Sequence, residues 1–202
     1  MKKIGILGGT FNPIHTGHLI LAENARTFYG LDEVWLIPSG CSYMKDASQI
    51  LPGSVRLRMS ALAAQDNPFF KVSDMEVVRP GSSYTYETLD ALKKQLPDSE
   101  LYFIVGADTL FHMESWKHPE RIFKSCVTVA AVRDEKGAAD LIAQAKYLSG
   151  KYNADIRFLP ASHIGISATQ IRERLKKGES VRYLVPESVR LFLEENGYYT
   201  ES

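Results

Sequence analysis

The chain has 202 residues, 45% of them hydrophobic, which is enough to bury one substantial core, so we expect a single domain. Its 24 basic residues balance 24 acidic ones, and a chain without net charge has no global field to attract nucleic acid. No apolar run approaches the roughly 20 residues of a membrane span, and the run at residues 4–7 is too short for a signal peptide. We therefore expect a cytoplasmic protein that binds neither nucleic acid nor a membrane and keeps Cys41 and Cys126 reduced.

Six segments are predicted to be strands: five are short apolar runs, and residues 69–78 alternate in polarity after Lys71. In chain order they cover residues 4–7, 34–37, 69–78, 101–105, 127–132 and 156–159. Amphipathic helices are predicted between them. This alternation predicts an α/β fold: a Rossmann-like open parallel sheet with helices on both faces and right-handed crossovers. We assign residues 1–160 to that core and residues 161–202 to a small helical C-terminal extension of the same domain.

The first predicted strand runs into the most informative segment, which reads GGTFNPIHTGH over residues 8–18. Glycines at the junction between a buried strand and a helix leave backbone N–H groups exposed, and these can hold a phosphate together with the helix dipole. His15 and His18 can both face such a ligand, and Gly17 leaves room for it to approach the backbone. The spelling matches neither the P-loop nor the dinucleotide fingerprint. We interpret the segment as a nucleotide phosphate site.

Two other interpretations of residues 8–18 are an exposed turn that carries two histidines by chance and a zinc site, since His-x-x-His spacing suits that metal. No further Cys or His lies near enough in the sequence to complete a zinc set. No cluster of carboxylates marks a metal site built by the protein either, so we expect none.

A second candidate for anion binding reads ISATQIR over residues 166–172. Ser167 followed three residues later by Gln170 is the spelling of a capping box, which predicts a helix start. Thr169 and Arg172 share one face of that helix and add a hydroxyl and a guanidinium to the free N–H groups. Taken alone, this is only a capped surface helix. Its pairing with the first segment favours a second phosphate site.

Three further features could serve a nucleotide. Asp108 follows a predicted central strand and is well placed to accept hydrogen bonds from ribose hydroxyls. Trp116 stands among polar residues, where it could be ordinary packing or a stacking platform. The loop at 39–53 is longer than most connections of its kind and carries Lys45 as its only basic residue.

The two phosphate segments together resemble the bacterial nicotinate-nucleotide adenylyltransferases, which belong to the nucleotidyltransferase superfamily with an HxGH motif. The similarity spans almost the whole chain and includes GSSYTY at 81–86, VGAD at 105–108 and EENGYY at 194–199. The chain departs from the family pattern in three places. Asn12 replaces a frequent Asp, Ile14 replaces a frequent Pro, and Lys45 lacks the histidine that often precedes it.

The resemblance implies transfer of AMP from ATP to nicotinate mononucleotide, with Mg²⁺ carried by ATP, to give nicotinate adenine dinucleotide and pyrophosphate in NAD biosynthesis. It implies that His15, His18 and Arg172 are catalytic. The ATP-binding residues are by this resemblance Gly8, Gly9, Thr10, Phe11, His15, Gly17, His18, Gly106, Asp108, Ser167, Thr169 and Arg172. Those of the nicotinate mononucleotide site are Lys45, Tyr84, Thr85, Trp116 and Lys117.

Two alternatives stay open at this point. The same transfer could use nicotinamide mononucleotide or phosphopantetheine as the acceptor, because backbone donors that read a ring carboxylate are invisible in a sequence. A protein of another class, a sensor that binds ATP without turning it over, would keep the same loop. The sequence gives no indication of the oligomeric state.

Overall fold

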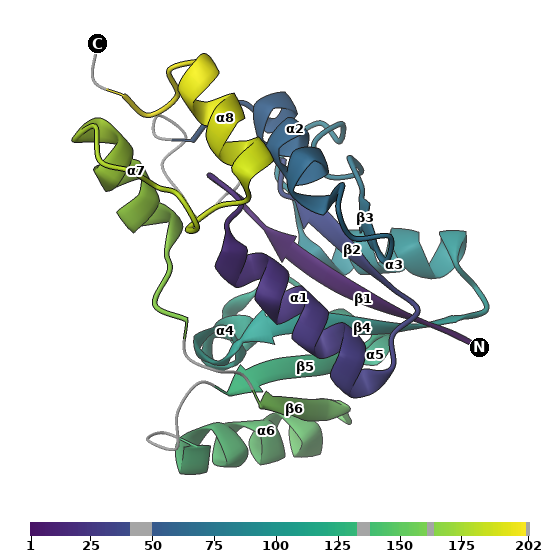
Figure 1. The fold of residues 1–202 in the computed structure, drawn as a ribbon. Helices are drawn as coiled ribbons and strands as arrows, with labels where there is room; N and C mark the ends of the chain where they lie inside the picture. The colour runs from purple at the N-terminus through teal and green to yellow at the C-terminus, as the bar shows by residue number, and fades with distance from the viewer. Residues whose placement is uncertain (41–49, 133–137, 161–163, 201–202) are drawn as a thin grey trace. The chain divides into compact units, whose positions relative to one another are not determined.

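The structure is a computed structural model that describes residues 1–40, 50–132, 138–160 and 164–200 (Figure 1). Its strands are β1 Lys2–Gly9, β2 Glu33–Pro38, β3 Phe70–Val72, β4 Ser99–Gly106, β5 Val127–Val132 and β6 Ile156–Pro160. Its helices are α1 Thr16–Tyr29, α2 Gly53–Ala64, α3 Thr85–Gln95, α4 Ala107–His112, α5 Pro119–Ser125, α6 Ala138–Tyr152, α7 Ala168–Lys176 and α8 Glu187–Glu195. A short 3₁₀ helix, η2, covers Met113–Ser115.

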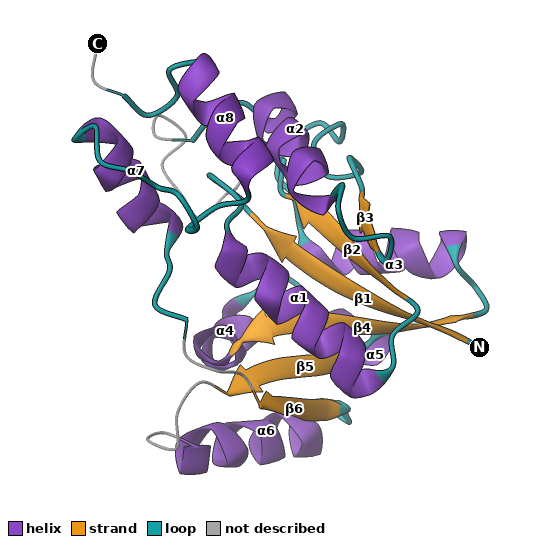
Figure 2. Cartoon of the chain, in the orientation of Figure 1, coloured by secondary structure: helices purple, strands orange, loops and turns teal. Residues whose placement is uncertain are grey.

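The strands form one six-stranded sheet in the order β3-β2-β1-β4-β5-β6 (Figure 2). Strand β1 pairs in parallel with β4, β4 with β5, and β5 with β6. This order is that of the doubly wound dinucleotide-binding folds, in which ligands bind beyond the carboxyl ends of the strands. The predicted open parallel α/β sheet is confirmed.

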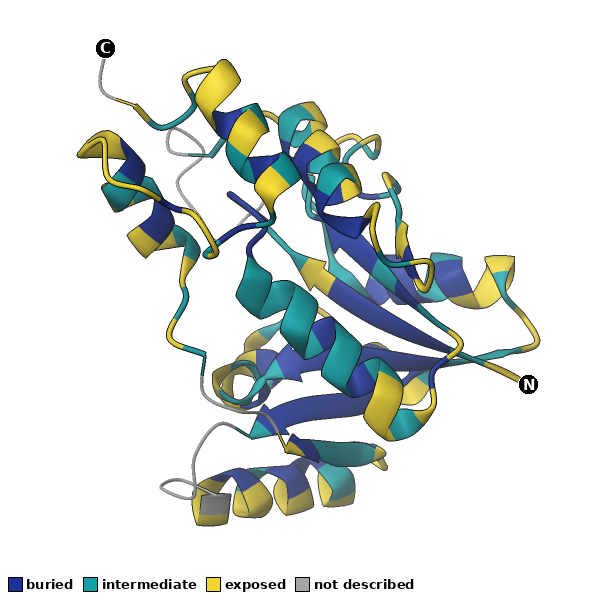
Figure 3. Cartoon of the chain, in the orientation of Figure 1, coloured by how far each residue is buried: buried dark blue, intermediate teal, exposed yellow. Residues whose placement is uncertain are grey.

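The central strands are continuous apolar runs because both of their faces are covered. In β4, Leu101, Tyr102 and Ile104 are each 1% exposed, and β5 is buried over most of its length (Figure 3). In Figure 1, α1 lies on the near face of these strands, and α3 and α5 lie on the far face. Strand and helix patterns in the sequence therefore identified the right elements here.

The chain forms two compact units, each assembled from separate segments. The first unit comprises Met1–Leu7, Leu21–Trp35 and Ser83–His163, and it holds β4, β5 and β6 with their helices. The second unit comprises Gly8–Ile20, Leu36–Ser82 and Ile164–Ser202, and it holds α2, α7 and α8. The single domain with a boundary after residue 160 stays a prediction.

In the second unit, α8 packs on α2. The Ser188 hydroxyl donates a hydrogen bond of 3.0 Å to the Leu62 carbonyl, and the α8 side chains of Val189 and Leu193 are fully buried. The apolar face of α8 is therefore buried within this unit, where the helix packs on α2.

The prediction of a strand over 69–78 was wrong beyond β3. Val72 ends the strand, and the Val78 N–H donates to the Asp74 carbonyl at 3.0 Å, so this stretch turns back on itself. Ser73 contributes because its hydroxyl accepts a hydrogen bond from the Met75 N–H, an alternative to strand pairing that short polar side chains offer.

Among the described residues, no helix is both long and apolar enough to cross a membrane.

Gly5, in the middle of β1, provides a test of the packing in the first unit. A Cβ atom there would lie 2.9 Å from Leu31 Cδ1 and 3.0 Å from Val34 Cγ2. Overpacking of this kind costs about 1–3 kcal/mol, so Gly5→Ala should lower the free energy of unfolding in urea by that amount. Gly150→Ala is the control, because a Cβ at this position of α6 meets no atom and should be neutral or stabilise by up to about 1 kcal/mol. Equal stability of the two variants would contradict this packing.

Candidate active site

The loop between β1 and α1 is shaped by aromatic rings that lie against its glycines. A Cβ atom at Gly9 would lie 2.8 Å from Cε1 of Phe11, and one at Gly17 would lie 3.1 Å from Nδ1 of His15. A side chain at Gly9 would force the Phe11 ring to shift, and one at Gly17 would crowd the His15 ring, because the loop folds its own side chains onto its backbone. The sequence suggested that Gly17 leaves room for a ligand, whereas in the structure the ring of His15 lies beside it. Residues 11–15 are all buried.

The two histidines of this loop are stacked. Their ring centroids lie 3.6 Å apart with 23° between the ring planes, and His15 is buried while His18 is half-buried. The His15 backbone N–H donates a hydrogen bond of 3.2 Å to His18 Nδ1. Since a backbone N–H is always a donor, a neutral His18 carries its proton on Nε2. In this tautomer His18 can donate a hydrogen bond to an acceptor such as a phosphate oxygen.

The start of α7 lies beside this loop. Ser167 caps the helix, because its Oγ accepts a hydrogen bond from the Gln170 N–H at 3.2 Å. A Cβ atom at Gly17 would lie 3.8 Å from the Cβ of Ile166, so the residues that precede α7 contact the start of α1. The structure thus brings together the two segments that the sequence paired as phosphate sites.

Arg172 joins the two segments directly. Its Nη1 donates to the Asn12 carbonyl at 2.9 Å, and its Nη2 donates to Thr169 Oγ1 at 3.3 Å. None of the described carboxylates forms an ion pair with Arg172. Its positive charge is therefore held next to the loop without an acidic partner from that part of the chain, which suits an anionic ligand.

Asn12 gathers contacts from three other parts of the second unit. Its Oδ1 accepts hydrogen bonds from the Leu51 N–H at 3.1 Å and from the Tyr199 hydroxyl at 2.5 Å, and its carbonyl accepts from Arg172. Sequence reasoning noted Asn12 only as a departure from a family pattern and gave Tyr199 no role. Neither contact has a local sequence signal, because each joins residues far apart in the chain.

Arg56 is a second residue that the sequence did not single out. It lies on α2 and is 2% exposed. Its guanidinium donates to the carbonyls of Thr10 at 2.7 Å, Leu51 at 2.9 Å and Gly40 at 3.0 Å. An arginine on a predicted helix usually indicates a solvent-exposed face, so its burial could not be predicted.

The other predicted site residues lie in the first unit. Gly106 ends β4 and caps α4, and Asp108 lies exposed in the first turn of that helix. A carboxylate at a helix N-terminus is favoured by the dipole and stays accessible to a ligand. This is the position, beyond the carboxyl end of a central strand, where the sequence placed a ribose contact.

Trp116, Lys117 and Tyr84 come together in this same unit. The Trp116 ring packs edge-on against Phe103, with centroids 6.3 Å apart, and its buried Nε1 has no hydrogen-bond partner among the described residues. Buried donors are rarely left unsatisfied, so this N–H is suited to a ligand acceptor. The Lys117 ammonium lies 4.3 Å from the centre of the Tyr84 ring, and Thr85 begins α3 directly after Tyr84.

The turn that precedes Trp116 is fastened to α6. Glu114 Oε1 forms an ion pair with Lys151 and accepts hydrogen bonds of 3.1 Å from both Tyr147 and Tyr152. The hydrogen bond from Lys151, followed by those from the tyrosines, holds the pKa of Glu114 below its usual value. Three donors from one helix thus hold the 3₁₀ turn that leads to the predicted stacking residue.

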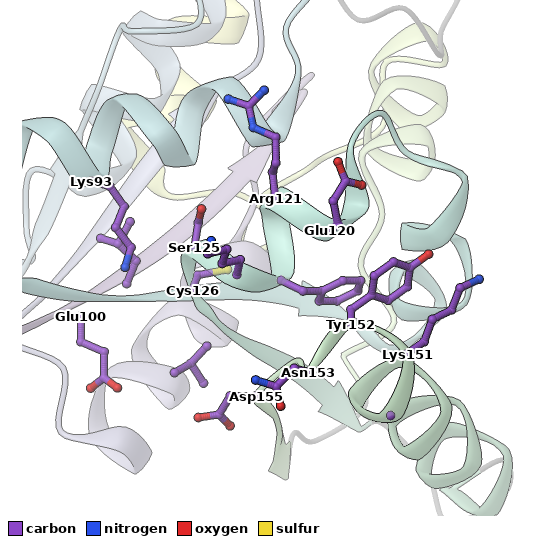
Figure 4. A pocket seen from close by; sticks show the side chains of 15 residues that line it. Lys93, Glu100, Glu120, Arg121, Ser125, Cys126, Lys151, Tyr152, Asn153 and Asp155 are labelled. Atoms are coloured by element: carbon purple, nitrogen blue, oxygen red, sulfur yellow. The ribbon is translucent and has the colours of Figure 1, made fainter.

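A pocket of about 880 Å³ lies at the other ends of these strands from Gly106 (Figure 4). Residues at the beginning of β4 and β5 line it, among them Glu100 and Val127, together with Lys93 of α3 and Lys151 of α6. The described residues that line it include none of the predicted site residues. Cys126 also borders it, and burial raises the pKa of its thiol to about 12, so it stays protonated.

Lys45 and Cys41 lie outside the described residues. The predicted site residues that the structure describes therefore form two groups. The phosphate segments with Arg172 belong to the second unit, and the residues around Asp108 and Trp116 belong to the first.

Comparison with known proteins identifies the class. The fold and the two phosphate segments define a nucleotidyltransferase, and a model of the cytidylyltransferase-like family matches residues 6–174. Relatives include the probable nicotinate-nucleotide adenylyltransferases of Lachnoclostridium phytofermentans, 44% identical over 98% of this chain and 100% of that one, and of Dehalococcoides mccartyi strain 195, 42% identical over 98% and 97%. The chain belongs to the family of nicotinate-nucleotide adenylyltransferases.

A solved structure supports the fold. The nicotinic acid mononucleotide adenylyltransferase of Plasmodium falciparum complexed with NaAD matches with a TM-score of 0.80, covering 98% of both chains at 17% identity. At that identity, the likeness shows a common fold and no more.

The Glu114 contacts make a prediction about pH. A carboxyl group whose pKa is lowered in the folded state stabilises the protein above its unfolded pKa of roughly 4.3, and this contribution is lost as the pH falls through the folded pKa. Wild type should therefore exceed Glu114→Gln in free energy of unfolding at neutral pH, and urea titrations should show the difference shrinking in acid. A difference that does not change with pH would contradict the ion pair with Lys151.

Proposed function

We propose that this enzyme transfers AMP from ATP to nicotinate mononucleotide, giving nicotinate adenine dinucleotide and pyrophosphate in NAD biosynthesis. The observation that carries the proposal is the hydrogen bond from Arg172 to the Asn12 carbonyl, which joins α7 to the loop that precedes α1. The curated relatives, which share about two fifths of their residues with this chain over nearly its whole length, supply the choice of reaction.

The triphosphate is assigned to the second unit. The backbone of Gly8, Gly9, Thr10 and Phe11, together with Gly17 at the start of α1, offers N–H groups near a helix dipole. His15 and His18 add imidazoles, and Ser167, Thr169 and Arg172 add hydroxyl and guanidinium donors from α7. These groups are donors or cations, which is the chemistry that a polyphosphate requires.

The ribose and the acceptor are assigned to groups in the first unit. Gly106 and Asp108 are proposed to contact the ATP ribose. The ring of nicotinate mononucleotide is proposed to bind at Trp116 and Lys117, with Tyr84 and Thr85 beside them. The assignment of Lys45 to this substrate depends on the sequence alone.

The reaction needs no general base. The nucleophile is a phosphate monoester with a second pKa of about 6, so it is already anionic at neutral pH. An oxygen of this monoester forms a bond to the α-phosphorus of ATP while the bond from that phosphorus to the bridging oxygen breaks. The electron pair leaves with pyrophosphate. The protein's part is to align the two substrates and to stabilise the charge that develops on the leaving oxygens, by His18 and Arg172 in particular.

The donors of the phosphate site suit phosphate oxygens and not a bare cation, so Mg²⁺ is proposed to arrive on the triphosphate, held by its oxygens and by water. When bound there, it neutralises charge on the transferring group. The residues assigned to the triphosphate above are proposed to orient it.

A panel of acceptors tests the reaction. Pyrophosphate release should be fastest with nicotinate mononucleotide, compared at equal concentration with nicotinamide mononucleotide and phosphopantetheine. Equal or faster turnover of either competitor would reassign the acceptor. ATP binding without pyrophosphate release in the presence of any of the three would favour a sensor of ATP.

The orientation of His18 yields a second test. Because the His15 backbone N–H occupies Nδ1, a neutral His18 carries its proton on Nε2, so His18→Ala should lower kcat by on the order of 100-fold or more through lost stabilisation of the leaving group. His112→Ala, at an exposed histidine of α4, is the matched control and should keep the wild-type rate. A near-normal kcat for His18→Ala would remove this residue from the proposed mechanism.

A further inference from the structure

The end of the chain returns to the phosphate loop. Tyr199, which follows α8, donates its hydroxyl to Asn12 Oδ1 at 2.5 Å, across 187 positions of sequence. Its backbone has φ +64, a left-handed conformation that residues with a side chain rarely adopt. The fold therefore holds Tyr199 in a strained backbone conformation while its hydroxyl donates to Asn12.

The Tyr199 hydroxyl is protonated at neutral pH and can donate a hydrogen bond. Burial raises the pKa of Tyr199 above its usual value, and the charges of Arg172 and Arg56 oppose that shift without cancelling it. The proton therefore stays on the oxygen at neutral pH and points to Asn12.

Asn12 accepts hydrogen bonds from three residues that are distant in the sequence. Its side-chain oxygen has two acceptor lone pairs, and the Leu51 N–H and the Tyr199 hydroxyl use both of them. Its carbonyl accepts from Arg172, and the residue is 6% exposed. The stacked pair of His15 and His18 follows Asn12 in the same loop.

We propose that Tyr199 is a positioning residue for the triphosphate, acting through Asn12 to hold the loop between β1 and α1 in its ligand-binding geometry. The proposal rests on the proposed function for the identity of the ligand. It assigns a role to the C-terminal segment beyond the packing of α8. Tyr199 itself is not placed in contact with ATP.

The neighbouring residue supplies a matched control. Tyr198 packs its ring on Phe192 of α8, with centroids 5.6 Å apart, so it serves the helix and not the loop. Tyr199→Phe and Tyr198→Phe each remove one hydroxyl from adjacent positions. Only the first removes a hydrogen bond to Asn12.

The experiment measures the Kd of ATP by calorimetry and the KM of each substrate for wild type and both variants. A lost hydrogen bond of this kind corresponds to roughly a three- to tenfold change, so Tyr199→Phe should raise the Kd and KM of ATP by that factor. The KM of nicotinate mononucleotide should not change, and Tyr198→Phe should match wild type. Loss of folded protein alone would lower the apparent kcat and leave each KM and Kd as it was.

A double-mutant cycle tests the path through Asn12. If the hydroxyl acts through that side chain, Tyr199→Phe should have no further effect on ATP binding in an Asn12→Ala background. Should Asn12→Ala fail to fold, the comparison of Tyr199→Phe with Tyr198→Phe decides the matter by itself. Unchanged ATP affinity in Tyr199→Phe, an equal loss in Tyr198→Phe, or full additivity with Asn12→Ala would overturn the proposal. Wild type that binds ATP without releasing pyrophosphate would overturn the proposed function and leave the Tyr199 comparison standing.

Discussion

The hydrogen bond between Arg172 and the Asn12 carbonyl is the interaction on which the site depends. It joins α7 to the loop after β1, and the two residues are 160 positions apart in the chain. A hydrogen bond from a charged donor contributes about 1.5–3 kcal/mol, which favours keeping the loop and α7 together. Without it, each helix start would offer a few N–H groups, which is the situation at most helices. With it, the two starts can act on one ligand.

The same guanidinium also explains why a phosphate ligand is favoured. Within the described part of the chain, Arg172 has hydrogen-bond acceptors but no carboxylate partner. In the proposed function, the triphosphate supplies the negative charge that the described residues do not bring to this guanidinium.

Arg56 provides the second constraint. Its buried guanidinium holds Thr10 of the phosphate loop together with Gly40 and Leu51, the described residues that stand on either side of 41–49 and close to it. Three backbone carbonyls thus accept hydrogen bonds from one buried charged group, and removing that group would break all three hydrogen bonds. The loop after β1 is therefore held by hydrogen bonds from Arg56, Arg172 and Tyr199.

Much of the fold could be predicted from local sequence. The apolar runs of β4 and β5 and the Ser167 cap of α7 are short-range signals, and all three are present in the structure. The strand over 69–78 was too long because Ser73 and Asp74 favour a turn, which an apparent alternation concealed. The burial of Arg56, the hydrogen bond of Tyr199 and the ring that occupies the space beside Gly17 could not be predicted. Each is decided by which distant segments pack together, and no spacing within one segment encodes that.

The central claim is that the loop after β1 and the start of α7 bind one triphosphate together. Hydrogen–deuterium exchange with and without a non-hydrolysable ATP analogue tests it most directly, by following peptides that cover residues 8–20 and 164–176. The account predicts that both peptides become protected over the same range of analogue concentration. Protection of only one of them, or protection of the two at clearly different concentrations, would contradict it.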